Sequence, residues 1–161
     1  MTRKELNARY PFLECVAMHK HANGGGWVAD TATVDATAFV GPDAVVSGSA
    51  LVSRSAQVYG SAQVYGSALV YGSALVSGSA RVSGSAQVDT AEALIVVGPI
   101  GSRKDHTTYC IKSDAIFCGC FTGTLDEFAE AVKKTHPANQ YGKEYKAAIT
   151  LFKAAQKRFA K

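Results

Sequence analysis

The sequence predicts a mainly β protein, in which a parallel β-solenoid of about four coils is followed by a small α+β unit. Valine recurs at every sixth residue from Val28 to Val88, and alanine stands two positions before each valine from Val34 onward. A six-residue period fits neither a helix of about 3.6 residues per turn nor a simple alternating strand. Beyond residue 94 the period stops, and patterns of ordinary strands and amphipathic helices follow.

The predicted organisation has three parts: an N-terminal cap at 1–22, the repeat region at 23–94 and the α+β unit at 95–161. Within each hexad the valine points into a narrow core, where alanine fits because a second large side chain has no room. Glycine, which is common at the second position, eases the bend between sides where a positive φ is needed.

Read in sixes from Asn23, segments such as YGSALV, SGSARV and SGSAQV resemble the repeats of hexapeptide-repeat proteins. The resemblance covers 23–94 and implies a left-handed parallel β-helix with three hexads in each triangular coil. At about 4.8 Å between stacked strands, the four coils would stand about 19 Å tall. Because members of this family are commonly homotrimers, the resemblance also implies a homotrimer.

Residues just before each valine are expected to point outward, and those 18 positions apart then stack in columns. Outward leucines beside tyrosines predict burial by a second copy of the chain. Scattered apolar surface residues, which are normal when they occur singly, are the alternative. The columns read Thr33, Leu51, Leu69, Gln87 and Phe39, Gln57, Leu75, and the tyrosines form a belt of Tyr59, Tyr65 and Tyr71.

Both ends of a solenoid expose unpaired strand edges, so each end needs a cap. We expect a short helix within 1–22 over the first coil and the tail beyond 95 over the other end. In the tail we expect strands at 94–100, 107–111 and 115–121, a helix that starts at a capping box at 124–127 and ends at His136, and a second helix over 140–159. The covering side chains are Leu6, Tyr10, Phe12, Leu13 and Trp27 at the first end, Leu125, Phe128 and Val132 on one helix, and Tyr141, Tyr145, Ala148, Ile149, Phe152 and Phe159 on the other.

Charge is unevenly distributed along the chain. Residues 95–161 carry eleven Lys and Arg against six Asp and Glu, whereas 23–94 carry two against five. A basic segment attracts anions, from nucleotides to nucleic acid, although solvated helix faces account for many of these lysines. No apolar run approaches 18 residues and no signal-peptide core precedes Pro11, so we expect a cytoplasmic protein with no membrane partner. The four cysteines are too sparse for a disulfide scaffold.

The segment GPIGSRK at 98–104 is the predicted ligand-binding site. Its glycines let backbone N–H groups converge on an anion, and its serine, arginine and lysine add donors and charge. Tyrosine rings on the coils can stack on a base, and an arginine can pair with phosphate. A structural turn with a solvated basic pair explains the segment about as well. The predicted ligand-binding residues are Gly98, Gly101, Ser102, Arg103, Lys104, His106, Tyr65, Tyr71 and Arg81.

Two thiols, Cys118 and Cys120, are predicted on one face of a strand. With His106 or His136 they would give an alternative zinc site, since structural zinc sites use four such ligands. Their spacing differs from the usual two-residue gap, and buried strand thiols are common. We therefore expect neither a metal nor a cofactor.

Many hexapeptide-repeat proteins are acyltransferases that use a histidine on a coil or loop as general base. Residues 22–105 contain no histidine, so we expect no catalytic residue. An acyl-CoA-dependent acyltransferase stays the main alternative if His106 reaches a groove between subunits. A structural trimeric scaffold is a second alternative.

The tail, GPIGSRKDHTTY followed by CGCFTGTLDEF, is similar to that of uncharacterised phage and bacterial hexapeptide-repeat proteins, as is the leader HKHANGGGWVADTATV. The favoured function is a non-catalytic homotrimer that captures a small anionic nucleotide-type ligand, as a phage protein would to sequester a host immune nucleotide signal. Nucleic acid is not expected as a partner, because the basic residues form no recognisable reading motif.

Overall fold

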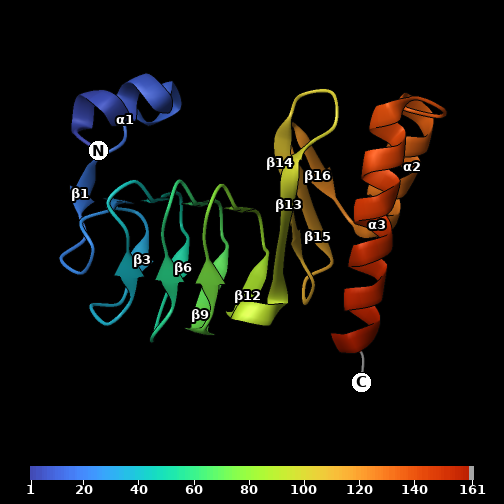
Figure 1. The fold of residues 1–161 in the computed structure, drawn as a ribbon. Coiled ribbons are helices and arrows are strands. Elements are labelled where there is room, and N and C mark those ends of the chain that lie inside the picture. The colour runs from blue at the N-terminus through green and yellow to red at the C-terminus, as the bar shows by residue number, and fades with distance from the viewer. Residues whose placement is uncertain (160–161) are drawn as a thin grey trace.

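In the computed structural model, which describes residues 1–159, the chain forms a β-solenoid of about four turns with a non-repeating segment at each end (Figure 1). Each turn adds a short strand to three parallel sheets, and paired residues such as Val28, Val46 and Val64 lie 18 positions apart. The predicted solenoid is confirmed. Its first face holds β2 (Trp27–Ala29), β5 (Val45–Val46), β8 (Gln63–Val64) and β11 (Arg81–Val82); its second β3 (Thr33–Val34), β6 (Leu51–Val52), β9 (Leu69–Ser73) and β12 (Gln87–Thr90); its third β4 (Phe39–Val40), β7 (Gln57–Val58) and β10 (Leu75–Val76).

The hexad pattern explains the solenoid interior. From Val40 to Val88 every hexad valine is 0% exposed, and the partner alanines are at most 2% exposed. At the corners, Gly48 has a φ of +67°, and a Cβ there would lie 2.8 Å from the backbone nitrogen of Gly66 one turn away. Glycine is needed at this corner because both the left-handed backbone and the close stacking exclude a side chain.

The N-terminal segment forms α1 (Arg3–Arg9), a short 3-10 helix η1 (Pro11–Leu13) and β1 (Met18–Lys20). Thr2 caps α1 in a capping box with Glu5. Strand β1 pairs antiparallel with β2, so it covers the outer edge of the first face. The two helices lie on the side of that face beside β2 and β5.

Apolar contacts hold this N-terminal segment in place. Leu6, Tyr10 and Leu13 pack with Trp27 and Val45 in one buried cluster. The sequence predicted all of these side chains except Val45. The prediction for Phe12 is wrong, because its side chain is 69% exposed. Leu13 is the buried residue of η1, and it packs against the first face of the solenoid at Trp27 and Val45.

The C-terminal unit is an antiparallel sheet in the order β13 (Leu94–Ile100), β14 (Asp105–Cys110), β15 (Ala115–Cys118) and β16 (Phe121–Gly123). A 3-10 turn, η2 (Ala91–Ala93), connects it to the last coil. The predicted single strand over 115–121 is wrong, because the chain turns at Gly119, whose φ is +59°. The unit has four strands instead of three, and Cys118 and Cys120 flank a turn instead of sharing a strand face.

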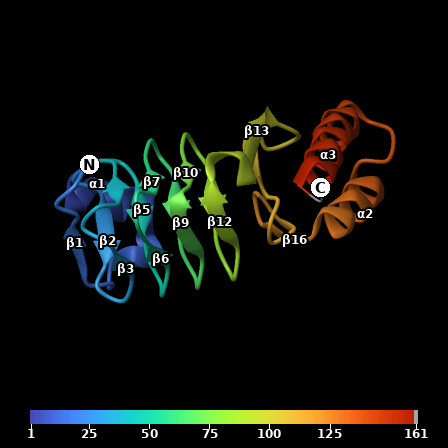
Figure 2. The ribbon, with the colours of Figure 1, turned by 90° about the horizontal axis from the view of Figure 1, so that it is seen from below.

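One face of this sheet closes the end of the solenoid, and the other packs against two helices (Figure 2). Cys110 and Phe117 join the valine core of the last coil. Two backbone N–H groups of that coil find side-chain acceptors in the sheet: Arg81 donates to Thr108 Oγ1 at 3.0 Å and Gln87 to Ser113 Oγ at 3.3 Å. The predicted cap beyond residue 95 is confirmed.

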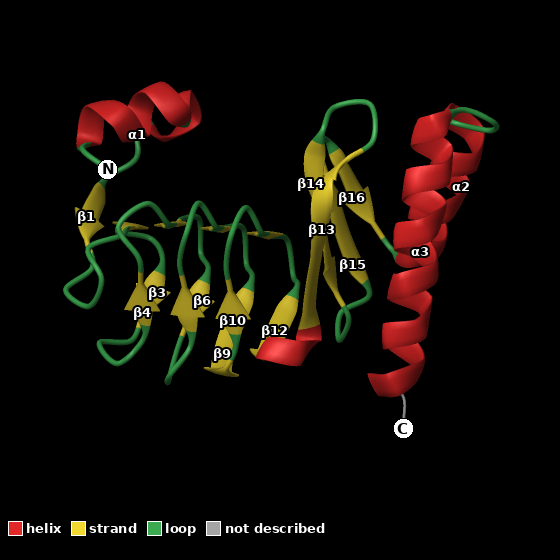
Figure 3. Cartoon of the chain, in the orientation of Figure 1, coloured by secondary structure: helices red, strands yellow, loops and turns green. Residues whose placement is uncertain are grey.

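The two C-terminal helices are α2 (Leu125–Thr135) and α3 (Gln140–Phe159), which form the outermost layer (Figure 3). Helix α2 begins at the predicted capping box of Thr124 and Glu127 and ends at His136. Their apolar faces are buried as predicted, except for Tyr141 and Phe159, which are 41% and 38% exposed. No described helix has the length and apolar character needed to cross a membrane.

Candidate functional site

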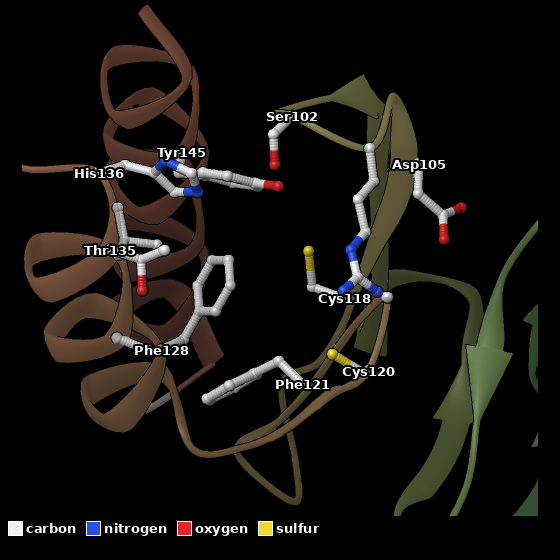
Figure 4. A pocket seen from close by; sticks show the side chains of 13 residues that line it. Ser102, Asp105, Cys118, Cys120, Phe121, Phe128, Thr135, His136 and Tyr145 are labelled. Carbon is white, nitrogen blue, oxygen red and sulfur yellow. The ribbon is translucent and has the colours of Figure 1, made fainter. Parts of the chain in front are cut away.

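A cavity of about 280 Å³ lies in the C-terminal unit, between the end of its sheet and the two helices. Figure 4 shows Phe128, His136 and Tyr145 entering from the helices, with Cys118 and Ser102 opposite them. The full lining is Ser102, Arg103, Asp105, Cys118, Gly119, Cys120, Phe121, Phe128, Ala131, Val132, Thr135, His136 and Tyr145.

Two turns and two helices bring these side chains together. The turn between β13 and β14 supplies Ser102 and Arg103, and the turn between β15 and β16 supplies Cys120. The Arg103 side chain lies over Gly119, where an added Cβ would be 3.4 Å from its Nη1. The sequence predicted Ser102 and Arg103 as binding residues, and the structure places both in this cavity.

The two predicted glycines have a packing role here. A Cβ on Gly101 would overlap the ring and hydroxyl of Tyr145, and the Gly101 N–H donates to Glu144 Oε2 at 2.7 Å. A Cβ on Gly98 would lie 2.8 Å from the Cα of His106. The predicted convergence of glycine N–H groups on an anion is therefore wrong at Gly101, because a carboxylate of the chain already accepts that bond.

Aromatic rings form one wall of the cavity. The Phe121 and Phe128 ring centroids are 5.2 Å apart, and Phe128 meets Tyr145 edge-to-face at 5.7 Å. His136 continues this row, with its ring 5.7 Å from that of Tyr145 and tilted by 31°. The rings are inclined to one another, so the wall presents both ring faces and ring edges, and a planar group can stack on one of the faces.

The polar groups of the cavity are the Tyr145 hydroxyl, at the end of this wall, and the side chains of Ser102, Arg103 and Cys118 (Figure 4). Burial raises the pKa of the Tyr145 hydroxyl to about 12, and the neighbouring Cys118 thiol and Glu144 act in the same direction. Tyr145 is therefore a neutral hydroxyl at physiological pH. The Cys118 sulfur accepts a hydrogen bond from the Thr107 hydroxyl at 3.0 Å. Within residues 1–159 the Arg103 guanidinium forms no ion pair, so its charge is available to a ligand in the cavity.

A second, polar cavity of about 300 Å³ lies over the first face of the solenoid, and we call it the face groove. Arg81 forms the boundary between the two cavities, since its Nη1 is 3.5 Å from both Asp105 Oδ2 and the Gly119 carbonyl oxygen. Asp105 lines both cavities. The face groove is lined by Arg9, Tyr10, Ser61, Gln63, Ser79, Arg81, Asp105 and His106.

The remaining predicted residues are scattered. Arg81 and His106 line the face groove and not the cavity that holds Arg103. Lys104 is exposed in the β13–β14 turn with a φ of +49°, and lines neither cavity. Tyr71 accepts a hydrogen bond from Lys112 Nζ at 2.8 Å, and Tyr65 is 36% exposed on a solenoid corner; neither lines either cavity.

Sequence reasoning missed His136 and Tyr145 as cavity residues. It placed Tyr145 on an apolar helix face, and it used His136 as the end of α2 and as a possible zinc ligand beside Cys118 and Cys120; the helix face and the helix end are confirmed. Their position distinguishes them, because both lie near the α2–α3 connection and line the cavity together with Ser102 and Arg103 of the β13–β14 turn. Within residues 1–159, no group of three His, Cys, Asp or Glu side chains is arranged to hold a metal ion.

No family model matches the chain, and no similar curated protein or solved structure was found. The geometry of the two cavities is therefore the basis for the functional argument.

Proposed function

We propose that this protein is a non-catalytic homotrimer that captures a small anionic, nucleotide-type ligand in the cavity of its C-terminal unit. One observation carries the proposal: a guanidinium without an ion pair within the described chain, that of Arg103, lies in a cavity with an aromatic wall. A guanidinium can pair with a phosphate through two hydrogen bonds, and an aromatic face can stack on a base.

The cavity size restricts the ligand. At about 280 Å³ it lies at the lower end of small-molecule pockets, which are typically about 300–1,000 Å³. A mononucleotide-sized ligand suits this space better than a dinucleotide or a nucleic acid strand. The excess of basic residues in 95–161 supports attraction of such an anion.

The proposed trimer rests on the outer faces of the solenoid. Leu51 and Leu69 on the second face and Leu75 on the third are only partly buried within one chain. A second copy packed on these faces would bury them. The resemblance of the hexads to hexapeptide-repeat proteins supports the same arrangement, and the resemblance of the tail supports a cytoplasmic phage protein that sequesters a host nucleotide signal.

A specific observation also favours an acyl-CoA-dependent acyltransferase as second candidate. His106 lines the face groove together with Ser61, Gln63 and Ser79 of the coils, so a histidine from outside the repeats faces a solenoid side. That is the placement a general base needs in this class of enzyme. The His106→Ala variant then loses any consumption of acetyl-CoA, whereas Arg103→Ala retains it.

Native mass spectrometry of the purified protein, followed by heat release, tests the proposal first. We expect a trimer that releases an intact nucleotide or binds one from a mononucleotide panel in calorimetry. Arg103→Ala should abolish binding and leave the thermal midpoint nearly unchanged, because the side chain is exposed. Lys104→Ala is the matched control, since Lys104 is a neighbouring exposed cation outside the cavity. A ligand-free protein that binds no nucleotide would refute the proposal.

A further inference from the structure

We propose that the face groove is a second binding site, which takes a small molecule bearing an oxyanion, either a phosphate or a carboxylate group. This site is separate from the cavity of the C-terminal unit and does not depend on the function proposed for it. The decisive residues are Tyr10, Arg9 and Arg81.

Three distant segments of the chain build this groove. Arg9 and Tyr10 come from the end of α1, Gln63 and Arg81 from β8 and β11, and His106 from β14. In Figure 1 the α1 helix stands over the first turns of the solenoid, and the β13–β14 turn rises on the same side just past its last turn. The groove occupies the space between them, over the third and fourth turns.

The outward residues of the first face change character where the groove begins. On β2 and β5 they are Trp27 and Val45, which α1 and η1 cover. On β8 and β11 they are Gln63 and Arg81, which are half-buried and line the groove. The polar half of this face is therefore the part that the N-terminal helices leave open.

The hydroxyl of Tyr10 is the observation that points to a ligand. Tyr10 is only 7% exposed, and its ring packs in the apolar cluster beneath α1. Its hydroxyl oxygen is buried and has no hydrogen-bond partner among the described residues. Buried hydroxyls nearly always have a partner. Because Tyr10 also lines the groove, a molecule bound there is a candidate acceptor for this unpartnered hydroxyl.

The charge of the groove selects an anion. Its lining contains two guanidinium groups, Arg9 and Arg81, and one carboxylate, Asp105. Asp105 is already engaged, since its Oδ2 is 3.5 Å from Arg81 Nη1 and its Oδ1 accepts the His106 N–H at 2.7 Å. Arg9 lies over the Tyr10 ring at 5.5 Å and forms no ion pair within residues 1–159. The unpaired positive charge and the free hydroxyl are thus neighbours.

The Tyr10→Phe variant gives a sharp test, because it removes one oxygen and leaves the packed ring. Sodium phosphate and sodium acetate are titrated separately into the full-length protein at constant ionic strength, with chloride as the reference anion, and two-dimensional NMR spectra are recorded. We expect saturable shifts from at least one anion, which identifies the group the site prefers. Tyr10→Phe should weaken the affinity about tenfold, as expected for loss of about 1.4 kcal/mol from a charge-assisted hydrogen bond.

Two controls make the result specific. Tyr59→Phe removes the same atom from a tyrosine that is 37% exposed and outside the groove, and it should leave the affinity unchanged. Arg103→Ala should also leave it unchanged, so failure of this site and failure of the nucleotide site are distinguishable. Without anion, Tyr10→Phe should keep or raise the thermal midpoint.

Three results would overturn the proposal. The first is the absence of saturable binding for both anions. The second is wild-type affinity in Tyr10→Phe. The third is a lower thermal midpoint of Tyr10→Phe without anion, which would mean that the hydroxyl has an internal partner.

Discussion

The solenoid and the C-terminal unit are both built mainly from β-strands, yet they differ in what they leave open. In the solenoid one valine and one alanine per hexad fill the interior, and from Val40 to Val88 these valines are fully buried. In the C-terminal unit the turns and helices are unlike one another, and a cavity of about 280 Å³ remains between them. A strictly repeating core gives a uniform framework, whereas candidate binding sites arise where the repetition ends.

The first prediction tests whether the C-terminal unit is less tolerant than a solenoid corner. Gly101 and Gly78 both have a positive φ, of +73° and +64°, but only Gly101 is packed against Tyr145, while a Cβ on Gly78 meets nothing within 4 Å. Gly101→Ala should lower the free energy of unfolding by about 3–4 kcal/mol, from backbone strain and overpacking together. Gly78→Ala should cost only about 1–2 kcal/mol. Urea denaturation of both variants measures the difference, and equal losses would contradict it.

The second prediction concerns the uniformity of the solenoid core. Val64 is fully buried in an interior turn, whereas Val34 in the first turn is only partly buried. Val64→Ala should cost about 2–3 kcal/mol, because it removes two methyl groups and leaves a cavity that neighbouring rungs cannot fill. Val34→Ala should cost about 1 kcal/mol. If the two midpoints in urea agree, the first turn is packed as tightly as the interior, and the burial difference carries no energy.

The third prediction addresses the junction between the two regions. The Thr108 hydroxyl accepts the Arg81 N–H and is buried, so Thr108→Val leaves that backbone donor unpaired at a cost of about 2 kcal/mol. Thr107→Val is the control, because this equally buried hydroxyl donates only to the Cys118 sulfur, a weak acceptor. Hydrogen exchange at Arg81 should speed up in Thr108→Val alone. Unchanged exchange there would show that another group accepts the bond.

The fourth prediction uses the thiol at the same junction. Burial raises the pKa of Cys110 to about 12 from its ordinary 9.0. Above pH 9 the thiol ionises in the unfolded chain but not in the native protein, so the unfolded state binds fewer protons and stability falls. This stability is fully present below pH 9 and is lost as the pH rises towards 12. At pH 10 the loss is about 1.4 kcal/mol.

Urea denaturation under reducing conditions, from pH 8 to pH 10, measures this fourth effect. Cys110→Ala should flatten the pH dependence by that amount, whatever its effect on stability at pH 8. Cys15→Ala, which changes an exposed thiol, should keep the wild-type pH dependence. A Cys110→Ala curve parallel to the wild type would mean that the Cys110 thiol titrates normally in the native protein.

The solenoid and the helices were predictable because their signals are local. The six-residue repeat predicts the burial of each valine and alanine directly. The capping box that starts α2 spans only the four residues from Thr124 to Glu127. The turn at Gly119 was harder, because a Cys-Gly-Cys segment fits a strand as well as a tight turn. The burial of Phe12 was wrongly predicted because a 3-10 helix has three residues per turn, so the side chains of Pro11, Phe12 and Leu13 point in three different directions. Of these three residues, Leu13 is the buried one.

The candidate sites were only partly predictable, since they depend on contacts between distant segments. Arg103 was found from its glycine-rich turn, and Arg81 and His106 from their charge and chemistry. The sequence does not indicate that the Gly101 N–H bonds to Glu144, 43 residues away, or that Asp105 lines both cavities. Nor does it place Tyr10 beside Arg81, because that depends on which side of the first coils α1 covers.

The solenoid has a fixed rise per coil, so the number of coils determines the distance between the two ends of the face groove. Helix α1 is anchored on the first two rungs of the first face, and β14, which carries His106, stands past the last rung (Figure 1). One additional coil of 18 residues would move Arg9 away from His106 by about 4.8 Å without changing any residue of either wall. The number of coils, and not only the identity of the lining side chains, therefore sets the length of molecule that this groove can span.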